Sequence, residues 1–207
     1  MDSWIDIDNI RKSSDEIEYH PLKPFIFPDT RILFLGSFPP QRKRWCIDFF
    51  YPNFINDHWR IEGLVFYDDK NHFVDDSNKR FCLEDIINHC RIHGIGFYDT
   101  AFAIRRLADN ASDKFLEVVE PSDLRRLCSL SEQLQVIVTT GTKATETFCM
   151  NMGIEHVPKV GAHVDIPELN GVTLYRLPSS SRAYPLSLEK KAEAYRKVLR
   201  RVALTKI

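Results

Sequence analysis

Four short apolar segments along the chain alternate with longer segments in which apolar residues recur every three or four positions. The apolar segments are residues 31–35, 95–98, 136–140 and 174–177, and each is followed by glycine, proline or a polar residue. Runs of this length bounded by turn residues are typical of buried strands. Strands that alternate with helices predict a small parallel sheet of four strands covered on both faces, which is a three-layer α/β/α fold.

The periodic segments predict the helices of the two outer layers. These helices cover residues 83–93, 122–130, 142–152 and 187–202. Gly94 is a suitable stop for the first helix, and Ser122 and Ser187 are suitable N-caps for the second and the last. The last helix is amphipathic and basic.

Four other segments have weaker signals. Residues 13–16 can start a short helix inside an N-terminal extension of residues 1–30, whose prolines favour an extended lead-in to the first strand. A long loop with a short helix is expected over residues 41–61, and loop with some helix over residues 101–120. Residues 63–82 have the apolar and polar stretches of a hairpin, which predicts a surface insertion.

The composition is that of an ordinary globular protein. Hydrophobic residues make up 43% and charged residues 28% of the 207 residues, which suits a single domain over residues 1–207 with a sizeable core. The sequence has no run long enough to cross a bilayer and no signal-peptide pattern, so we expect a cytoplasmic protein. The five cysteines and seven histidines have no spacing that indicates a metal site, so no metal is predicted.

The net charge of −1 argues against a protein coated in positive charge, but lysine and arginine are clustered along the chain. The clusters are Arg42–Arg44, Arg105–Arg106, Arg125–Arg126 and the last helix. An enzyme that binds nucleic acid needs only a local positive patch, so this distribution is compatible with one. A solvated surface is the alternative that the charge pattern leaves open.

The carboxyl ends of the four predicted strands meet at one edge of the sheet, where open sheets of this kind bind ligands. The crevice would be formed by residues 36–40, 99–100, 139–142 and 178–182. Gly36 allows the backbone to approach a ligand closely. Basic and then aromatic residues follow this turn, and that combination suits a flipped or single-stranded nucleotide.

Three of these strand ends resemble, in sequence and in order, the motifs of the uracil-DNA glycosylase superfamily. The first motif, a strand followed by Gly-x-x-Pro and later an aromatic residue, stands here as Gly36–Pro39 with Phe49. The last motif, a strand followed by a loop rich in serine and proline, stands as Leu177–Ser181. Between them lies a strand end with Asp99 and then Arg105, where the family has an amide or an acid followed by an arginine.

The segment from Asn56 to Trp59 has an Asn-x-x-Trp pattern that resembles the mismatch-specific and hypoxanthine-acting branches. The resemblance covers residues 31–200 and implies a monofunctional DNA glycosylase that removes uracil or hypoxanthine in base-excision repair. It implies DNA with a damaged or mismatched base as the partner and no cofactor; we expect a monomer. The rival functions are a catalytically silent nucleic-acid-binding module on the same fold and a hydrolase of free nucleosides or nucleotides.

The resemblance also implies roles for individual residues in the crevice. Phe49 would stack on the extruded base unless it packs in the core, and backbone N–H groups of Ser37 and Phe38 would stabilise the departing base anion. Hydroxyl and cationic groups would hold phosphates of the DNA. These groups belong to Ser179, Ser181, Arg182, Arg42, Lys43, Arg44 and Arg105. For the two serines, a plain turn is the alternative.

Two departures from the family pattern change which residue is predicted to position the water. Phe38 stands where the uracil enzymes have a water-activating Asp and the mismatch enzymes an Asn, and Ser179 stands where they have His. Branches without the first polar residue use an Asn of the Asn-x-x-Trp segment, so Asn56 is the predicted water-positioning residue and Asn53 the nearby alternative. Asp99 would accept a ring N–H of the base or act as an acid or base, unless it only caps a turn.

Overall fold

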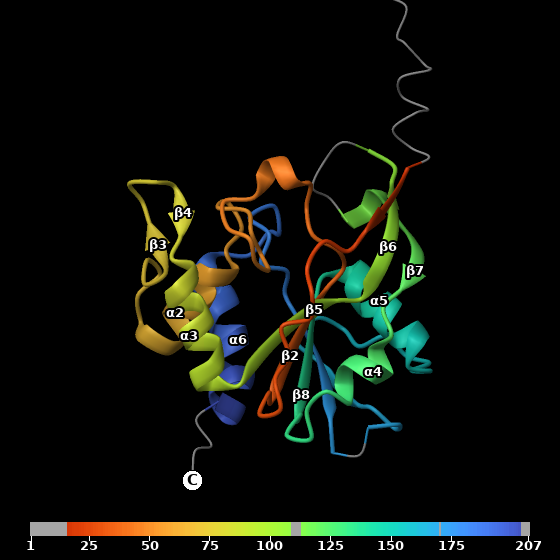
Figure 1. Cartoon of the computed structure of the whole chain (residues 1–207). Coiled ribbons are helices and arrows are strands. Elements are labelled where there is room, and N and C mark those ends of the chain that lie inside the picture. The colour runs from red at the N-terminus through yellow and green to blue at the C-terminus, as the bar shows by residue number, and fades with distance from the viewer. Residues whose placement is uncertain (1–15, 109–112, 170, 204–207) are drawn as a thin grey trace, which may run out of the picture.

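A computed structural model describes residues 16–108, 113–169 and 171–203, in which a five-stranded sheet lies between two layers of helices (Figure 1). Its strands are β2 (Ile32–Gly36), β5 (Ile95–Asp99), β8 (Val136–Thr140), β10 (Thr173–Leu177) and β9 (His163–Asp165). The first four are parallel in the order β5-β2-β8-β10, and β9 pairs antiparallel with β10 at the edge. The predicted four-stranded parallel sheet is confirmed, and β9 is an addition to it.

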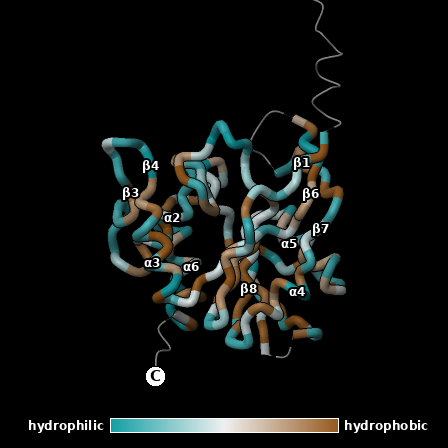
Figure 2. The backbone as a smooth tube through the Cα atoms, viewed as in Figure 1, coloured by the Kyte–Doolittle hydropathy of each residue, from teal (hydrophilic) through white to brown (hydrophobic). Residues whose placement is uncertain are grey.

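Burial explains why the parallel strands produce clear apolar runs. Residues 32–35 of β2 are fully buried, and β5 and β8 are buried along their whole length. Figure 2 shows the central segments as largely hydrophobic and many of the outer loops as hydrophilic. A parallel strand with helices on both faces has no side that faces water, so its sequence is continuously apolar rather than alternating.

Five α-helices form the two outer layers of the described chain (Figure 1). On one face lie α2 (His58–Tyr67), α3 (Leu83–His93) and α6 (Leu188–Ala203), and on the other α4 (Leu124–Cys128) and α5 (Thr142–Asn151). Gly94 ends α3 in the left-handed conformation with φ of 65°, and the Ser187 hydroxyl accepts a hydrogen bond from a first-turn amide of α6 at 3.3 Å. Helix α4 is shorter than predicted, and Asp123 is its N-cap. The Ser122 hydroxyl instead donates to the Asp99 carbonyl.

The surface hairpin predicted over residues 63–82 is wrong for its first five residues, which complete helix α2. Only the two-residue strands β3 (Val74–Asp75) and β4 (Arg80–Phe81) pair as a hairpin. The run Leu64–Tyr67 is apolar at every position and so resembles a strand locally, but α2 packs against α6. Phe73 and Phe81 are buried, so the hairpin is anchored in the core.

A second, three-stranded sheet replaces the loop with some helix that was predicted over residues 101–120. Strand β6 (Ala101–Arg106) pairs antiparallel with β7 (Leu116–Pro121) and with β1 (Ile17–Tyr19). Register shifts interrupt the β6–β7 pairing near Ala103. A bulge of this kind breaks the two-residue alternation by which a half-exposed strand is recognised in a sequence.

The N-terminal segment is more than an extended lead-in to the first parallel strand. Besides the pairing of β1, the backbone of Phe25 forms a bridge with Phe97 of β5. Residues 13–15 of the predicted short helix lie outside the described residues, and Glu16 directly precedes β1. Within the described ranges, no helix is long and apolar enough to cross a membrane.

Candidate functional site

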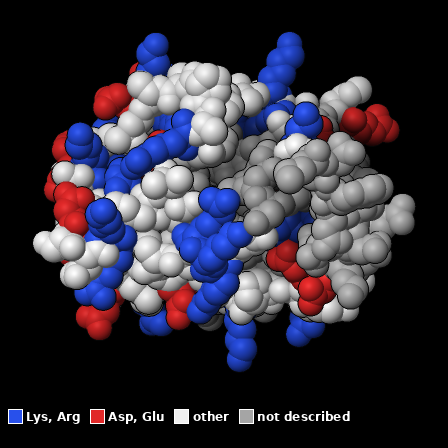
Figure 3. All heavy atoms as spheres, turned by 90° about the horizontal axis from the view of Figure 1, so that it is seen from above, with Lys and Arg blue, Asp and Glu red and all other residues white. Residues whose placement is uncertain are grey.

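The carboxyl ends of β2, β5, β8 and β10 open into a crevice of about 930 Å³, to which all four predicted strand-end segments contribute. The cations that line it are Arg44, Arg106, Lys114, Lys143, Arg176 and Arg182, and the acids are Asp99, Asp113 and Glu146. Figure 3 shows the molecule from this side, with several separate groups of Lys and Arg side chains among mostly uncharged residues. Because cations outnumber acids, the crevice suits an anionic ligand although the chain has a net charge of −1.

The turn after β2 brings the backbone against Asp99. A Cβ atom at Gly36 would collide with the Asp99 carboxylate, so only glycine fits beside this side chain. The Gly36 carbonyl accepts hydrogen bonds from the amide and the hydroxyl of Thr100, at 2.8 and 3.1 Å. Phe38 is buried in a small apolar cluster and forms an apolar part of the crevice wall.

Asp99 lies at the end of β5 in the crevice, as predicted, and it has a partner that the sequence did not indicate. The Nε2 atom of His20 is 2.8 Å from Asp99 Oδ2, in a buried hydrogen bond. The two residues are 79 positions apart, so no local spacing relates them. In the sequence, His20 is only a single histidine directly before a proline-rich segment.

Asp113 is a second crevice carboxyl group that sequence reasoning missed, because residues 101–120 were predicted as loop with some helix and only Arg105 was singled out there. Burial raises its pKa, a hydrogen bond with the Ser37 side chain opposes the shift, and the charge of Asp99 adds to it. Asp113 therefore joins the turn after β2 to the segment before β7.

The two candidate water-positioning amides both line the crevice. The Oδ1 atom of Asn56 accepts a hydrogen bond from the His58 amide at 2.9 Å, and that of Asn53 accepts from the Ile55 amide at 3.1 Å. Each oxygen therefore holds a local turn and keeps a second lone pair for another donor. The Arg60 guanidinium also donates to the Asn56 carbonyl, at 3.3 Å, which fixes the backbone before α2.

Phe49 was predicted to face the crevice, but other rings of the segment Phe49–Tyr51 do so. Phe49 is buried in the core against Trp59 and Phe97, so core packing is the role that its position supports. Its neighbours Phe50 and Tyr51 line the crevice. Tyr51 has a positive φ of 49°, and its hydroxyl is 3.1 Å from the hydroxyl of Thr140 on β8.

The serine-rich loop after β10 lines the crevice and is tied to two helices. The Ser179 hydroxyl accepts from the Ser181 amide at 3.2 Å, so the turn that was the alternative role is present. Lys191 of α6 donates to the Ser181 carbonyl at 2.8 Å and to the Asp57 carboxylate at 3.0 Å. Arg182 donates to the same carboxylate at 3.0 Å. The loop is therefore held rigidly, with its hydroxyl groups at the crevice.

The predicted DNA-binding cations are divided between the crevice and the outer surface. Residues 42–44 form the 3-10 helix η1, and of these Arg44 lines the crevice, whereas Arg42 pairs with Asp48 on the surface. Arg105 pairs with Glu117 outside the crevice. Its neighbour Arg106 lines the crevice, where it pairs with Glu18 and donates to the Pro39 carbonyl at 3.2 Å.

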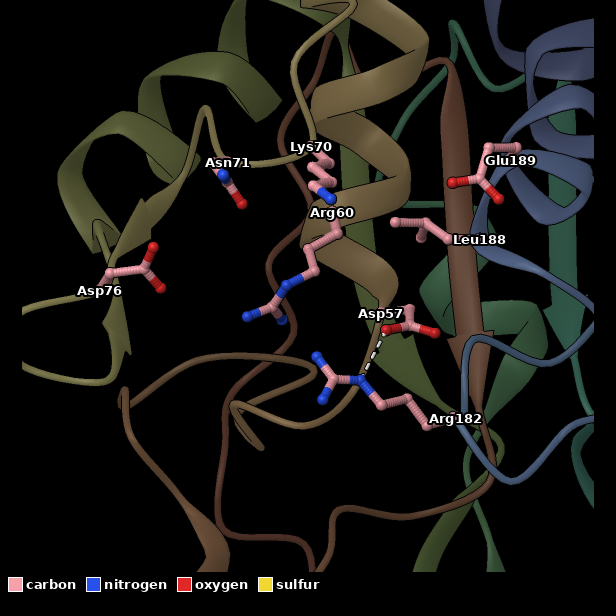
Figure 4. Close-up of a pocket in the computed structure, with 8 residues that line it drawn as sticks. All are labelled: Asp57, Arg60, Lys70, Asn71, Asp76, Arg182, Leu188 and Glu189. Carbon is pink, nitrogen blue, oxygen red and sulfur yellow. Dashed lines mark hydrogen bonds and ion pairs between the residues drawn. The ribbon is translucent and has the colours of Figure 1, made fainter.

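A second, smaller pocket of about 560 Å³ adjoins the crevice and shares Arg182 with it. Figure 4 shows the guanidinium groups of Arg60 and Arg182 pointing toward the same space, with Asp57 beside them. Burial and the charge of Arg182 lower the pKa of Arg60. Asp76 and Glu189 also line this pocket, so its charges are balanced. Among the described residues, no group of three or more His, Cys, Asp or Glu side chains is placed to hold a metal ion.

Fold and site together define a three-layer α/β/α protein with a cationic crevice at the carboxyl ends of its parallel strands. No family model matches the sequence, and no curated protein matches it. Among solved structures, it is similar to the solution NMR structure of a "putative Uracil DNA glycosylase" from Methanosarcina acetivorans, with a TM-score of 0.60 and 23% identity. The match covers 90% of this chain and 99% of that chain. The fold implied by the family resemblance is thereby confirmed, whereas membership of the superfamily and of one of its branches stays a prediction.

Proposed function

We propose that this protein is a monofunctional DNA glycosylase that hydrolyses the N-glycosidic bond of a deaminated base, uracil or hypoxanthine, during base-excision repair. It would act as a monomer without a cofactor, and its place nearest the mismatch-specific and hypoxanthine-acting branches belongs to the same proposal. The observation that carries it is the convergence of Asn56, Asp99 and the loop of residues 178–182 on one cationic crevice. The fold shared with the Methanosarcina protein supports it.

The crevice accounts for binding of an extruded nucleotide. Leaving the stack costs a base a few kcal/mol, which contacts in the pocket must offset. The rings of Phe50 and Tyr51 provide aromatic surface for the base. Arg44, Arg182 and the hydroxyl groups of the serine-rich loop would hold the flanking phosphates, which position the strand without reading its sequence.

Hydrolysis would rest on positioning and electrostatics. As the bond breaks, the sugar gains oxocarbenium character and the base becomes an anion. Backbone N–H groups of the turn at Ser37 and Phe38 would stabilise that anion, and Asn56 would orient the attacking water. An amide orients water well but is a poor base, so we expect slow turnover.

The test is an activity panel with the purified full chain in excess over labelled DNA. Duplexes and single strands would carry uracil, hypoxanthine, xanthine or mismatched thymine, and abasic product would be measured over time. We expect product with uracil or hypoxanthine. No abasic product with any of these substrates would overturn the catalytic proposal.

A catalytically silent DNA-binding module is the second candidate, because Phe38 forms an apolar wall where a polar residue would activate water. Binding of lesion-containing DNA that depends strongly on salt, without release of base, would favour this candidate. Cleavage of free deoxynucleosides without affinity for DNA would instead identify a nucleoside hydrolase.

A further inference from the structure

The N-terminal strand brings an imidazole into contact with Asp99, a residue that lines the crevice. His20 follows β1, and its backbone amide donates to the Phe102 carbonyl of β6 at 2.8 Å. From there the ring reaches Asp99, with Nε2 at 2.8 Å from Oδ2. The residue is therefore placed by pairing between the two strands and aimed at a side chain of the central sheet.

The hydrogen bond between His20 and Asp99 is shielded from water. The His20 side chain has no exposed surface, and that of Asp99 is 11% exposed. The imidazole packs edge-on against Phe38, with ring centroids 5.4 Å apart, and lies 4.4 Å from the ring of Tyr98. In such a low-dielectric setting a hydrogen bond is stronger than in water and its geometry is better defined.

The remaining ring nitrogen of His20 also has a partner. Its Nδ1 atom is 2.9 Å from the Leu22 carbonyl oxygen and 3.2 Å from the Leu22 amide nitrogen. An ionised carboxylate only accepts hydrogen bonds, so the group that faces Asp99 must be Nε2–H. Nδ1 then has a partner in either state of the ring: in the imidazolium it donates to the Leu22 carbonyl at 2.9 Å, and in the neutral ring it accepts from the Leu22 amide at 3.2 Å. Both nitrogens of His20 are thus satisfied while Asp99 is a carboxylate.

This arrangement assigns separate tasks to the two oxygens of Asp99. Oδ2 is occupied by His20, whereas Oδ1 lies close to the place that a Cβ atom would take at Gly36, and both residues line the crevice. A side chain at residue 36 would collide with Oδ1, so the glycine leaves room for this oxygen. Oδ1 is therefore held as a fixed acceptor beside the backbone wall.

We propose that His20 is a positioning residue that holds Asp99 with Oδ1 toward the bound base, and that this pair selects bases with a ring N–H at that edge. The inference rests on the proposed glycosylase function and deepens it. Uracil and hypoxanthine present such an N–H, whereas cytosine and adenine present a ring nitrogen with a lone pair that the carboxylate repels. Deamination converts the second kind of edge into the first, so one fixed acceptor separates damaged bases from their parents.

The first test compares His20→Phe with His20→Gln in single-turnover excision of uracil and hypoxanthine from duplex DNA. Phenylalanine keeps the ring packing but removes the donor, so the excision rate should fall about 10- to 100-fold with little change in DNA affinity. Glutamine can place an amide N–H where Nε2 lies, and should restore most of the rate. His163→Phe on strand β9, outside the crevice, is the matched control.

Two results would overturn the role of His20. One is a His20→Phe variant that excises at the wild-type rate, and the other is a His20→Gln variant as impaired as His20→Phe. The second result would mean that a hydrogen-bond donor at the place of Nε2 is not what His20 contributes. Thermal unfolding of each variant separates these outcomes from loss of the fold.

A second readout concerns selection of the base. N3-methyluracil lacks the ring N–H, so wild-type protein should excise it at least about 10-fold more slowly than uracil. In His20→Phe this ratio should shrink, because the acceptor is no longer held in place. An unchanged ratio would contradict the proposal, since a residue with only a structural role would lower both rates equally.

The two proposals can fail separately. No base release by the wild-type protein from any lesion would overturn the glycosylase function, and base selection by His20 and Asp99 with it. Normal release by wild type and by His20→Phe would overturn only the role of His20. Imidazole ¹⁵N spectra provide a readout besides activity: Nε2 of His20 should be protonated, and its signal should move in Asp99→Asn. A His20 without a proton on Nε2 would contradict the proposed arrangement.

Discussion

Glu62 of helix α2 is fully buried between two buried imidazole rings. Its carboxyl oxygens lie 3.6 Å from His58 Nε2 and 3.4 Å from His89 Nε2. Burial raises the pKa of Glu62 to about 8 and lowers that of His89 to about 3, and it holds the pKa of His58 well below its usual range. The cluster is therefore largely uncharged at neutral pH, beneath the ring of Tyr51 that stacks on His58.

This cluster predicts how stability depends on pH. The pKa values of His58 and His89 are lower in the folded than in the unfolded state. What the neutral rings contribute to the free energy of unfolding is therefore lost as pH falls below about 6.5. The pKa of Glu62 is higher in the folded state. Its contribution to the free energy of unfolding is therefore complete below about pH 4.5 and is lost as pH rises toward about 8. Between pH 6.5 and 8 only the loss remains, and the free energy of unfolding should fall by up to about 1.4 kcal/mol per pH unit. Urea denaturation at several pH values measures this.

Glu62→Gln is the matched variant for that measurement. The amide cannot ionise, so the decline in the free energy of unfolding between pH 6.5 and 8 should be absent or much smaller. An equal decline in both proteins would assign the pH dependence to other groups.

Substitution of Asn56 or Asp99 should affect catalysis far more than DNA binding. Asn56→Ala and Asp99→Ala should each lower single-turnover excision about 100-fold or more, because they remove water positioning and the contact with the base. Affinity for DNA should change little, as measured by fluorescence anisotropy. Asn71→Ala, outside the crevice, is the control. If both crevice variants excise normally, the assignment of the site is wrong even if the function is right.

Sequence reasoning located some site residues and could not locate others. Asp99 was predictable because it ends a buried strand, and the end of a parallel strand is a known place for a ligand. Phe49 and Tyr51 are two positions apart, and a loop with a left-handed residue decides which ring faces the crevice. No periodic pattern describes such a loop. His20 was out of reach because its partner is 79 positions away.

Asp57, at the start of helix α2, connects three elements through one carboxylate. It pairs with Lys191 of α6 and with Arg182 of the serine-rich loop, and its backbone amide donates to the Ser180 carbonyl at 3.0 Å. Lys191 is 1% exposed, so its ammonium group has been taken out of water. The loop beside the crevice therefore depends on a buried ion pair.

Asp57→Ala should destabilise the protein by about 3–5 kcal/mol, because it leaves the Lys191 charge buried without its carboxylate. The measurement is urea denaturation at neutral pH. Glu168→Ala breaks an exposed pair with Arg125 and should cost no more than about 1 kcal/mol, which makes it a suitable control. Equal effects of the two substitutions would show that the Asp57 pair is not a buried support.

Elements were predictable to the extent that their environment is uniform. Strands β2, β5 and β8 are predominantly apolar because neither of their faces meets water, and α3 and α6 keep helical spacing. Strand β6 carries Arg105 and Arg106 next to each other and begins at a register shift, so its sequence has neither signature. The apolar run at the end of α2 has no period at all, and only its packing against α6 decides that it is helical.

The whole molecule is close to neutral, yet cations outnumber acids at the crevice. Arg44 lines the crevice, and its buried Nε atom has no hydrogen-bond partner among the described residues. Arg44→Ala should weaken DNA binding and lower the slope of log affinity against log salt by about 1. Binding of an oligonucleotide measured between low and moderate salt gives this slope.

Arg42 and Arg105 are matched controls for this prediction, because each pairs with an acid outside the crevice. Arg42→Ala and Arg105→Ala should change the slope by much less than Arg44→Ala. The same slope change in all three variants would mean that DNA contacts the outer surface and not the crevice.

The hydrogen bond between His20 and Asp99 joins two parts of the fold whose local stabilities differ. Strand β5 lies in the central sheet, whereas β1 has three residues and only β6 as its paired neighbour. Short edge elements open at a lower free-energy cost than a buried core. Fraying of one strand would thus free Asp99 from its orientation while the rest of the molecule stays folded. On warming, this N-terminal edge would open first, and discrimination between bases would be lost at a temperature well below that of global unfolding.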